Sequence, residues 1–311
     1  MSAKTLRFPL RQTRRPMSNP TIYSYIADNK RRTFMVMVLF VLLITAVGYL
    51  FGYAMEAGST WIVATLSCST AITIFSYFYS DKAVLAISGA KSILKSDNPR
   101  LFRTVENLCV GAGLPYPEIY IINDTAPNAF ATGRDPKHAK IAVTSGLLSK
   151  LDDQQLEGVI AHELSHIKNF DTRLMTIVVI LVGVIALISD LFRRGGFRRN
   201  RRDREGGGII LIIAVIASLL APLIAQLLKF TISRQREYLA DSSAALLTRY
   251  PEGLAGALEK ISADREPLEV ANTATAHLYI VNPLKDYTDK VARLFSTHPP
   301  IKERVQRLRA M

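Results

Sequence analysis

Two uncharged stretches near the N-terminus constrain the fold of this chain more than any other feature. Residues 33–55 and residues 57–80 contain no Asp, Glu, Lys or Arg, and only Glu56 separates them. A helix needs about 20 apolar residues to cross the hydrocarbon core of a bilayer, and each stretch is longer than that. We therefore predict a transmembrane helical hairpin over 33–80. Two buried helices of a soluble protein are the alternative, but they would need a far larger surrounding domain.

A second apolar pair follows the middle of the chain. Residues 174–189 are uncharged but short for a full span, whereas residues 206–228 are long enough. Pro222 and Gln226 indicate a kink or a side that faces protein. The sequence thus predicts an integral membrane protein with up to four transmembrane helices. It leaves open whether the hydrophobic hairpin at 174–230 crosses the bilayer or is re-entrant.

Positive charge is concentrated beside these apolar segments. Most of the net charge of +13 comes from residues 1–32, with eight basic residues and one acidic residue, and from the loop 193–205, with seven arginines. This placement favours a lipid bilayer over nucleic acid as the partner. Basic residues flank both ends of the first hairpin, so both ends are expected in the cytoplasm. Residues 1–32 are predicted to be a basic, disordered tail rather than a transit peptide.

The remaining segments predict one mainly α-helical domain with a small β-sheet, divided in the chain into 81–173 and 231–311. Helices are predicted at 99–111, from Asp152 onwards, at 233–246, from Pro251 onwards and in the last residues, and strands are predicted at 117–123, 129–132 and 140–148. Cys68 and Cys109 lie far apart and form no metal-ligand pair. They suggest no disulfide framework, which is typical of a reducing compartment.

The segment VIAHELSHIKNFD at 159–171 carries the strongest chemical signal. His162 and His166 are one helical turn apart, so both imidazoles leave the same face and can bind one zinc ion. Glu163 lies beside the first histidine, where it can act as a general base without being a ligand. A solvated helix is the alternative. The neighbouring residues are apolar, however, and burying three ionisable groups without a purpose would be costly.

A catalytic zinc ion needs a third protein ligand and an open position. The segment SRQREYLAD at 233–241 offers Glu237 and, one turn later, Asp241. Glu237 can bind the metal while Asp241 orients a ligand histidine. A solvent-facing acidic pair is the alternative, and it would be mildly destabilising. Asn169 and Asp171, one turn after the second histidine, are candidates for the same supporting role, with ordinary helix termination as the competing interpretation.

Substrate binding is predicted at the turn-rich segment NAFATGR, which lies between two predicted strands. Extended peptides bind zinc peptidases by adding a strand to a sheet edge, and small residues here would let a substrate backbone approach. A plain connecting loop is the alternative. The candidate substrate-binding residues are Asn128, Ala129, Phe130, Ala131, Thr132 and Gly133.

Five segments in this order resemble the HtpX-type membrane zinc endopeptidases, a family related to the CAAX prenyl proteases. They are NAFATGR, VIAHELSHIKNFD, SRQREYLAD, ATAHLYIVNPL and LFSTHPPIKERVQRL. The resemblance covers nearly everything after residue 30. It implies a gluzincin-like zinc metalloprotease domain facing the cytoplasm, with one Zn²⁺ per chain.

The resemblance also assigns roles to residues. It implies that His162, His166 and Glu237 hold the zinc ion and that Glu163 is the general base. It implies that His298, in STHPP, is the catalytic donor to the oxyanion, although a histidine at a helix start is nearly as good an interpretation.

The expected function is therefore that of a membrane-anchored zinc endopeptidase of a bacterial inner membrane. By resemblance, it would act in stress response by cleaving misfolded or damaged membrane proteins from the cytoplasmic side. The alternatives are a processing protease for a specific or prenylated substrate and an inactive membrane scaffold that retains the motif. Four apolar runs are too few for the enclosed chamber of the prenyl proteases, and an inactive scaffold would ordinarily have lost a site residue. The oligomeric state is not predicted.

Overall fold

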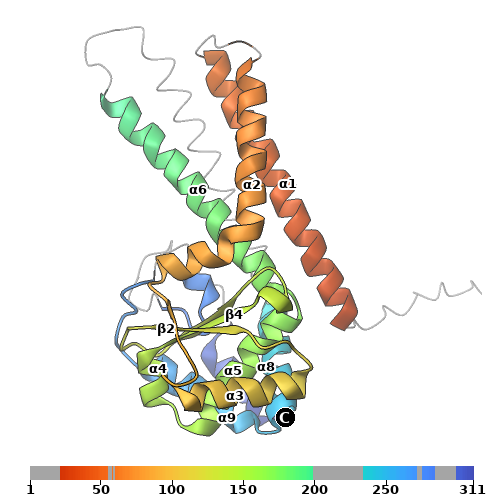
Figure 1. The fold of residues 1–311 in the computed structure, drawn as a ribbon, viewed down its shortest axis with the longest axis vertical. Helices are drawn as coiled ribbons and strands as arrows, with labels where there is room; N and C mark the ends of the chain where they lie inside the picture. The colour runs from red at the N-terminus through yellow and green to blue at the C-terminus, as the bar shows by residue number, and fades with distance from the viewer. Residues whose placement is uncertain (1–21, 55–57, 59, 199–233, 272–274, 284–298) are drawn as a thin grey trace, which may run out of the picture.

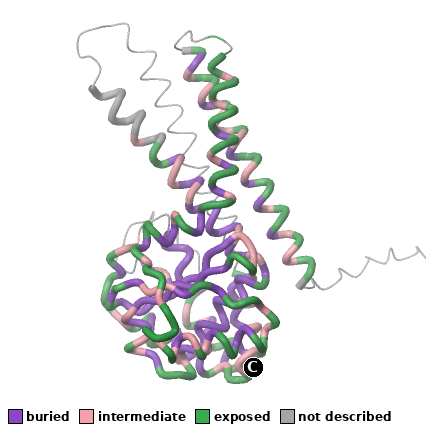
Figure 2. The backbone as a smooth tube through the Cα atoms, in the orientation of Figure 1, coloured by how far each residue is buried: buried purple, intermediate pink, exposed green. Residues whose placement is uncertain are grey.

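The computed structural model describes residues 22–54, 58, 60–198, 234–271, 275–283 and 299–311. Three helices, α1, α2 and α6, project in one direction from a body that holds the sheet and the remaining helices (Figure 1). Burial follows the same division: buried residues are concentrated in the body, and exposed residues line α1 and α2 (Figure 2).

The predicted hairpin is formed by α1 (Ile22–Ala54) and α2 (Thr60–Ile87), which pack side by side. Among the described residues, these are the two helices that are long and apolar enough to cross a bilayer on their own. Phe34, Leu42 and Phe75 project outward and are exposed, which suits an environment of lipid tails. The fold is therefore that of a membrane protein.

The start of α1 differs from the prediction. The disordered tail predicted over 1–32 is wrong for residues 22–32, which form the first turns of α1, while residues 1–21 lie outside the described residues. Hydropathy could not show this because the first turns are polar. They are held by contacts with the body, where Asn29 and Thr33 are buried.

Helix α6 (Asp171–Arg198) contains the apolar stretch 174–189 and lies against α1 and α2. One hydrophobic cluster joins Val36 and Phe40 of α1 to Leu174 of α6. Helix α6 is long and apolar enough to cross a bilayer only together with the preceding helix, from which it is bent by 81°. The second apolar stretch, 206–228, and residues 199–205 of the Arg-rich loop lie outside the described residues.

The sheet has four strands in the order β1-β2-β4-β3. They are β1 (Lys91–Ser92), β2 (Glu118–Ile122), β3 (Ala129–Thr132) and β4 (Lys140–Thr144). Strand β4 runs parallel to β2 and antiparallel to β3, so β3 is an edge strand of this sheet. The short strand predicted at 129–132 has these bounds. Strand β4 ends earlier than predicted because the Thr144 hydroxyl accepts the N–H of Leu147 and begins a helix.

The body contains six helices with described bounds. They are α3 (Pro99–Ala112), α4 (Ser145–Lys150), α5 (Asp153–Lys168), α8 (Arg234–Thr248), α9 (Pro251–Ala263) and α11 (Ile301–Arg309), with short 3-10 turns at Pro136–His138 and Ala276–Leu278. Helix α5, predicted from Asp152 onwards, begins with a capping box formed by Asp152 and Gln155.

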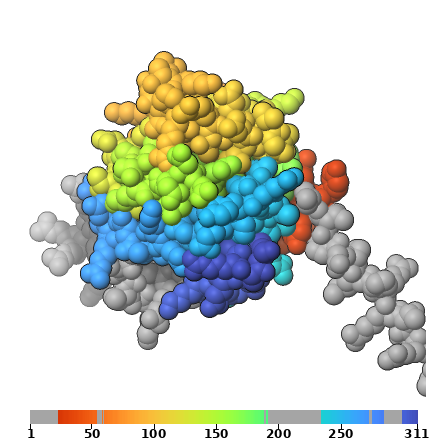
Figure 3. Space-filling model, turned by 90° about the horizontal axis from the view of Figure 1, so that it is seen from below, coloured from red at the N-terminus to blue at the C-terminus, as the bar shows by residue number. Residues whose placement is uncertain are grey.

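Helix α5 occupies the centre of the body. It packs on α3, α8, α9 and β3, and nearly every residue of its second half is buried. Helix α11 lies along α9 and α8 on the side of the body turned away from the projecting helices (Figure 3). The first and last segments of the body therefore enclose the helix that carries the candidate site.

Candidate metal centre

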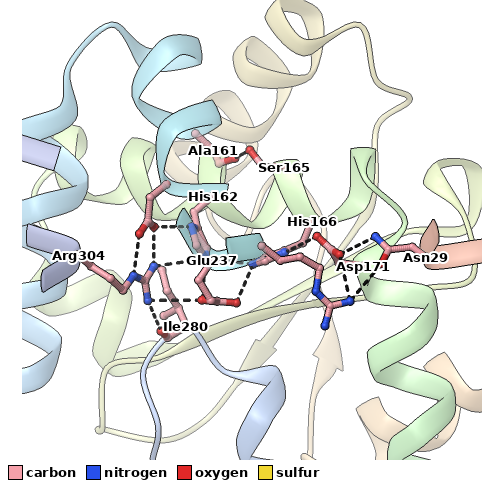
Figure 4. Close-up of polar contacts among 11 residues, drawn as sticks. Asn29, Ala161, His162, Ser165, His166, Asp171, Glu237, Ile280 and Arg304 are labelled. Carbon is pink, nitrogen blue, oxygen red and sulfur yellow. Dashed lines mark hydrogen bonds and ion pairs between the residues drawn. The ribbon is translucent and has the colours of Figure 1, made fainter. Parts of the chain in front are cut away.

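Three candidate ligands meet between α5 and α8. His162 and His166 lie one turn apart on α5, Glu237 lies in the first turn of α8, and all three are buried (Figure 4). The two histidine Nε2 atoms are 3.1 Å apart. Glu237 places Oε2 at 3.9 Å from Nε2 of His162 and Oε1 at 3.6 Å from Nε2 of His166. The packing of α5 on α8 therefore brings together the predicted ligand set from two distant segments.

Each histidine has its own carboxylate partner. Nδ1 of His162 lies 3.0 Å from Oδ1 of Asp241, and Nδ1 of His166 lies 3.0 Å from Oδ2 of Asp171. A carboxylate accepts hydrogen bonds, so these contacts assign the proton of each neutral imidazole to Nδ1. The predicted supporting roles of Asp241 and Asp171 agree with these positions. Asn169, the other predicted supporting residue, accepts a hydrogen bond from Asn29 through its backbone carbonyl.

This donor set fits a metal ion. With both protons on Nδ1, both Nε2 atoms direct lone pairs at the same point, and the Glu237 carboxylate adds a third donor. Lone pairs at these distances repel one another unless a cation, which can be a metal ion or a proton, lies between them. Tetrahedral zinc, with bonds of about 2.0–2.1 Å to nitrogen and oxygen, places neighbouring ligand atoms about 3.3 Å apart. The observed separations lie close to that value.

The ionisation of the two histidines reflects their surroundings. Burial lowers the pKa of His162 to about 4, against the opposing effect of its hydrogen bond with Asp241. Burial also lowers the pKa of His166, but the hydrogen bond to Asp171 and the charge of Glu237 outweigh it and raise that pKa to about 9. A metal ion must therefore displace a proton from His166 at neutral pH.

Glu163 lies between the two histidines in the chain but belongs to neither carboxylate pair. Burial raises the pKa of its carboxyl to about 7, while the charge of His166 and the backbone N–H of Ala131 favour the ionised form. A carboxylate with a pKa near neutrality is well matched to accepting and returning a proton. The N–H of Ala131 also places the edge strand β3 next to this group.

Arg304, on α11, is a member of the site that the sequence analysis missed. Its side chain is fully buried, and Nη2 and Nε donate to the two oxygens of Asp241 at 2.6 and 2.8 Å. Nη1 donates to the carbonyl of Ile280 at 3.0 Å and lies 3.6 Å from Glu237. The guanidinium thereby fixes Asp241 against His162. A signal was present, because Arg304 interrupts the helical stripe formed by Ile301, Val305 and Leu308.

A second missed network joins the site to the membrane helices. Asn29 of α1 donates to Asp171 and to the carbonyl of Asn169, and it accepts from Arg236, the residue before Glu237. Arg236 also lies 3.6 Å from Asp171. No sequence pattern singles out Asn29, because its partners come from segments more than 100 residues away.

The residues of the predicted substrate segment, Asn128 to Gly133, have different roles in the structure. Phe130 packs edge-on against Tyr279 at a ring distance of 5.2 Å, and the Thr132 hydroxyl contacts Thr176. Gly133 has φ 127°, and a Cβ there would lie 2.4 Å from the carbonyl oxygen of His138, so it serves a turn. The backbone of Ala129 and Ala131 faces away from β4.

The start of that outer edge is already occupied. Ile280 donates its N–H to the carbonyl of Ala129, and Asn128 donates its side-chain amide to the carbonyl of Val281. All four residues of β3 are buried. The other predicted catalytic residue, His298, lies outside the described residues.

Metalloproteases bind their metal ion in this way, with two histidines of a His-Glu-x-x-His helix and a glutamate from a second helix. The projecting apolar helices make this chain a membrane-bound member of that class. The family follows from comparison with known proteins. Residues 95–311 match Peptidase family M48, and the chain belongs to this family.

Several relatives are similar over almost their whole length. Proteins described as "Protease HtpX homolog" from Dictyoglomus thermophilum and Tropheryma whipplei (strain Twist) are each 46% identical to this chain. The alignments cover 94% and 93% of this chain and 95% and 98% of those proteins. A protein of the same description from Lactobacillus acidophilus is 42% identical, with 93% of this chain and all of that protein covered.

Among solved structures, the crystal structure of S. mikatae Ste24p is similar, with a TM-score of 0.48 and 18% identity over 93% of this chain and 67% of that one. The predicted resemblance to HtpX-type proteases is confirmed by the family match and the sequence relatives. The predicted fold class of helices with a small sheet is confirmed by the described elements of this chain. The chain is thus a membrane metalloprotease.

Proposed function

We propose that this protein is a zinc endopeptidase that binds one Zn²⁺ per chain through His162, His166 and Glu237. The observation that carries the proposal is the convergence of these three buried donors at one point, next to a buried carboxyl that is not needed as a ligand. A structural zinc site is ordinarily closed by four protein ligands, whereas a site with three leaves a position for substrate or water.

The roles of the remaining residues follow from their contacts. Bound zinc would act as a Lewis acid on the scissile carbonyl and make water a better nucleophile at neutral pH. Glu163 accepts the proton of the attacking water and later returns it to the leaving amine. Asp241 and Asp171 keep the two imidazoles in the orientation that turns Nε2 toward the metal position. Arg304 holds Asp241 and offsets part of the negative charge of the buried carboxylates.

Substrate would bind in an extended form along β3, with Ala131 as the central backbone contact. Support comes from the position of β3 at the edge of the sheet and of its Ala131 N–H beside Glu163. Asn128, Ala129, Phe130, Thr132 and Gly133 hold this strand in place. We assign the oxyanion donor to His298, on the basis of the family resemblance of its segment.

The substrates are proposed to be misfolded or damaged membrane proteins, cleaved at the cytoplasmic face of a bacterial inner membrane. Backbone binding at a strand edge reads little sequence, which suits the cleavage of unfolded chains. Lys30, Arg31 and Lys82 are exposed where α1 and α2 join the body, and positive charge marks the cytoplasmic end of a span. The similarity to proteins described as "Protease HtpX homolog" supports the proteolytic activity in this proposal.

The proposal is tested with the purified full-length protein in detergent. We expect one zinc ion per chain by metal analysis and cleavage of casein as a model unfolded protein. A chelator should abolish cleavage, and added zinc should restore it. Cleavage that persists after the zinc has been removed would contradict the proposal, and so would a folded protein that binds no zinc.

A further inference from the structure

Asn29 is an unusual residue for the polar end of a membrane helix. It is 3% exposed and lies where α1 meets the body, opposite the junction of α5 and α6. Its amide nitrogen donates to Oδ1 of Asp171 at 2.7 Å and to the carbonyl of Asn169 at 2.9 Å, and its amide oxygen accepts from Arg236 at 3.1 Å (Figure 4). The partners settle the orientation of the amide, because two of them can only accept and Arg236 can only donate.

The first of these bonds acts on the support of a candidate ligand. Asp171 uses its two oxygens for two different partners, with Oδ2 facing His166 and Oδ1 facing Asn29. Rotation of this carboxylate would break both contacts together. The bond from Asn29 therefore fixes the carboxylate in the orientation that holds the imidazole of His166.

The second bond lies on the other side of the bend between α5 and α6. Asn169 caps the end of α5, Asp171 begins α6, and Phe170 between them has a left-handed backbone with φ 60°. Asn29 thus bridges the bend by binding the residue on each side of it. Lys30, the next residue of α1, lies 4.4 Å from the centre of the Phe170 ring and adds a contact at the same place.

The third bond reaches α8. Arg236 is buried and immediately precedes the candidate ligand Glu237. Asn29 therefore bonds residues that follow α5 and a residue of α8, the two helices that supply the metal donors. We propose that Asn29 is a positioning residue through which the packing of membrane helix α1 against the body sets the metal affinity of the site. The inference rests on the proposed function, because it takes His166 as a metal ligand.

The proposal is distinguished from simple helix docking by the zinc dissociation constant, measured on the full-length protein by competition with a chromogenic chelator. Asn29→Leu keeps a side chain that branches at Cγ, although a larger one, and removes all three hydrogen bonds. We expect zinc affinity to fall about tenfold, the lower end of the range for residues that support a ligand from behind. Cleavage of casein should fall at limiting zinc and return toward the wild-type rate at saturating zinc.

Thr33→Val is the matched control. Thr33 is also buried on α1, one turn later, and its hydroxyl donates only to the carbonyl of Asn29 within the helix. This variant loses a buried hydrogen bond without touching Asp171, so its zinc affinity should stay within about twofold of wild type. Thermal unfolding of the metal-free proteins shows whether either variant is unfolded, and Asn29→Ala replaces Asn29→Leu if the larger side chain prevents folding.

A double-mutant cycle decides whether Asn29 acts through Asp171. Asp171→Ala should weaken zinc binding about 10–100-fold, and adding Asn29→Leu to it should cause little further loss. Independent, additive losses would overturn the proposal, and so would unchanged zinc affinity in a folded Asn29→Leu protein. If the wild-type protein itself binds no zinc, the proposed function fails instead.

Discussion

Each candidate ligand histidine has a carboxylate behind it, and each carboxylate has a further partner of its own. Asp241 is held by Arg304, and Asp171 is held by Asn29 and Arg236. Buried carboxylates are stable only when their oxygens are paired. The outer residues are therefore needed for the inner ones to stay paired and oriented, and they should matter for stability as well as for metal binding.

Replacing Arg304 tests this dependence. Arg304→Met should leave Asp241 buried without its bidentate partner, at a cost of about 3–5 kcal/mol in the free energy of unfolding. The Tm of the metal-free protein should fall by roughly 10 °C. Arg307→Ala is the control. Arg307 is also an arginine of α11, three positions after Arg304, but it is exposed, so its loss should change the Tm little. Equal Tm values for Arg304→Met and wild type would show that the pair contributes nothing.

The ligands could be predicted from sequence and their outer partners could not, for a physical reason. His162, Glu163 and His166 are fixed relative to one another by one helix, and Glu237 and Asp241 by another, so local spacing reveals them. Asn29 and Arg304 reach the site only through the packing of α1 and α11 against distant helices. Arg304 left a trace as a charge within an apolar stripe, whereas Asn29 left none.

At the scale of elements, α5, the helix that carries both candidate histidine ligands, is supported by its packing on α9. Gly158 of α5 faces the backbone of Leu254 on α9, and a Cβ there would lie 2.6 Å from the Leu254 nitrogen. Backbone cannot yield as a side chain can, so the two helices need glycine at this crossing.

The close approach predicts a difference between two glycine substitutions. Gly158→Ala should destabilise the protein by about 1–3 kcal/mol, because α9 must move away from α5. Gly256→Ala, in the same interface, would meet only the amide nitrogen of the Gln155 side chain at 3.2 Å, and should be nearly neutral. Chemical denaturation of both variants checks this, and equal stabilities would argue against tight packing at Gly158.

Elements were predicted best where the chain carries a periodic or strongly apolar signal. The apolar hairpin, the capped helix at Asp153–Lys168 and the short strand at Ala129–Thr132 all formed as expected. The first turns of α1 did not follow the prediction, because tertiary contacts rather than composition make them helical. Helix α9, predicted from Pro251 onwards, buries Leu254, Leu258 and Ile261 against its neighbours.

At the scale of the whole molecule, both parts of the catalytic body must lie on the same side of the membrane. Helices α5 and α8 are separated in sequence by the second apolar pair yet pack together at the site. Whatever path residues 199–233 take, the chain must return to the side that it left. From the charge flanking α1 and α2, we propose that this side is the cytoplasm.

Cysteine labelling in intact cells tests this arrangement. In a background with Cys68 and Cys109 replaced by serine, Asn107→Cys on α3 and Ser262→Cys on α9 should both resist a membrane-impermeant thiol reagent. Thr60→Cys, exposed at the turn between α1 and α2, should react. Permeabilised cells should label all three sites. Labelling of only one of the two body positions in intact cells would contradict a shared site.

One buried cluster is proposed both to hold zinc and to carry the proton for peptide hydrolysis. The most direct measurement compares zinc content and casein turnover in Glu163→Gln and His166→Ala, each purified as the full-length protein. Glu163→Gln should keep one zinc ion per chain and lose at least about 100-fold in turnover, because an amide cannot accept the proton of water. His166→Ala should lose zinc and turnover together, because only two protein ligands remain. Near-normal turnover by Glu163→Gln, or a full complement of zinc in His166→Ala, would contradict the account.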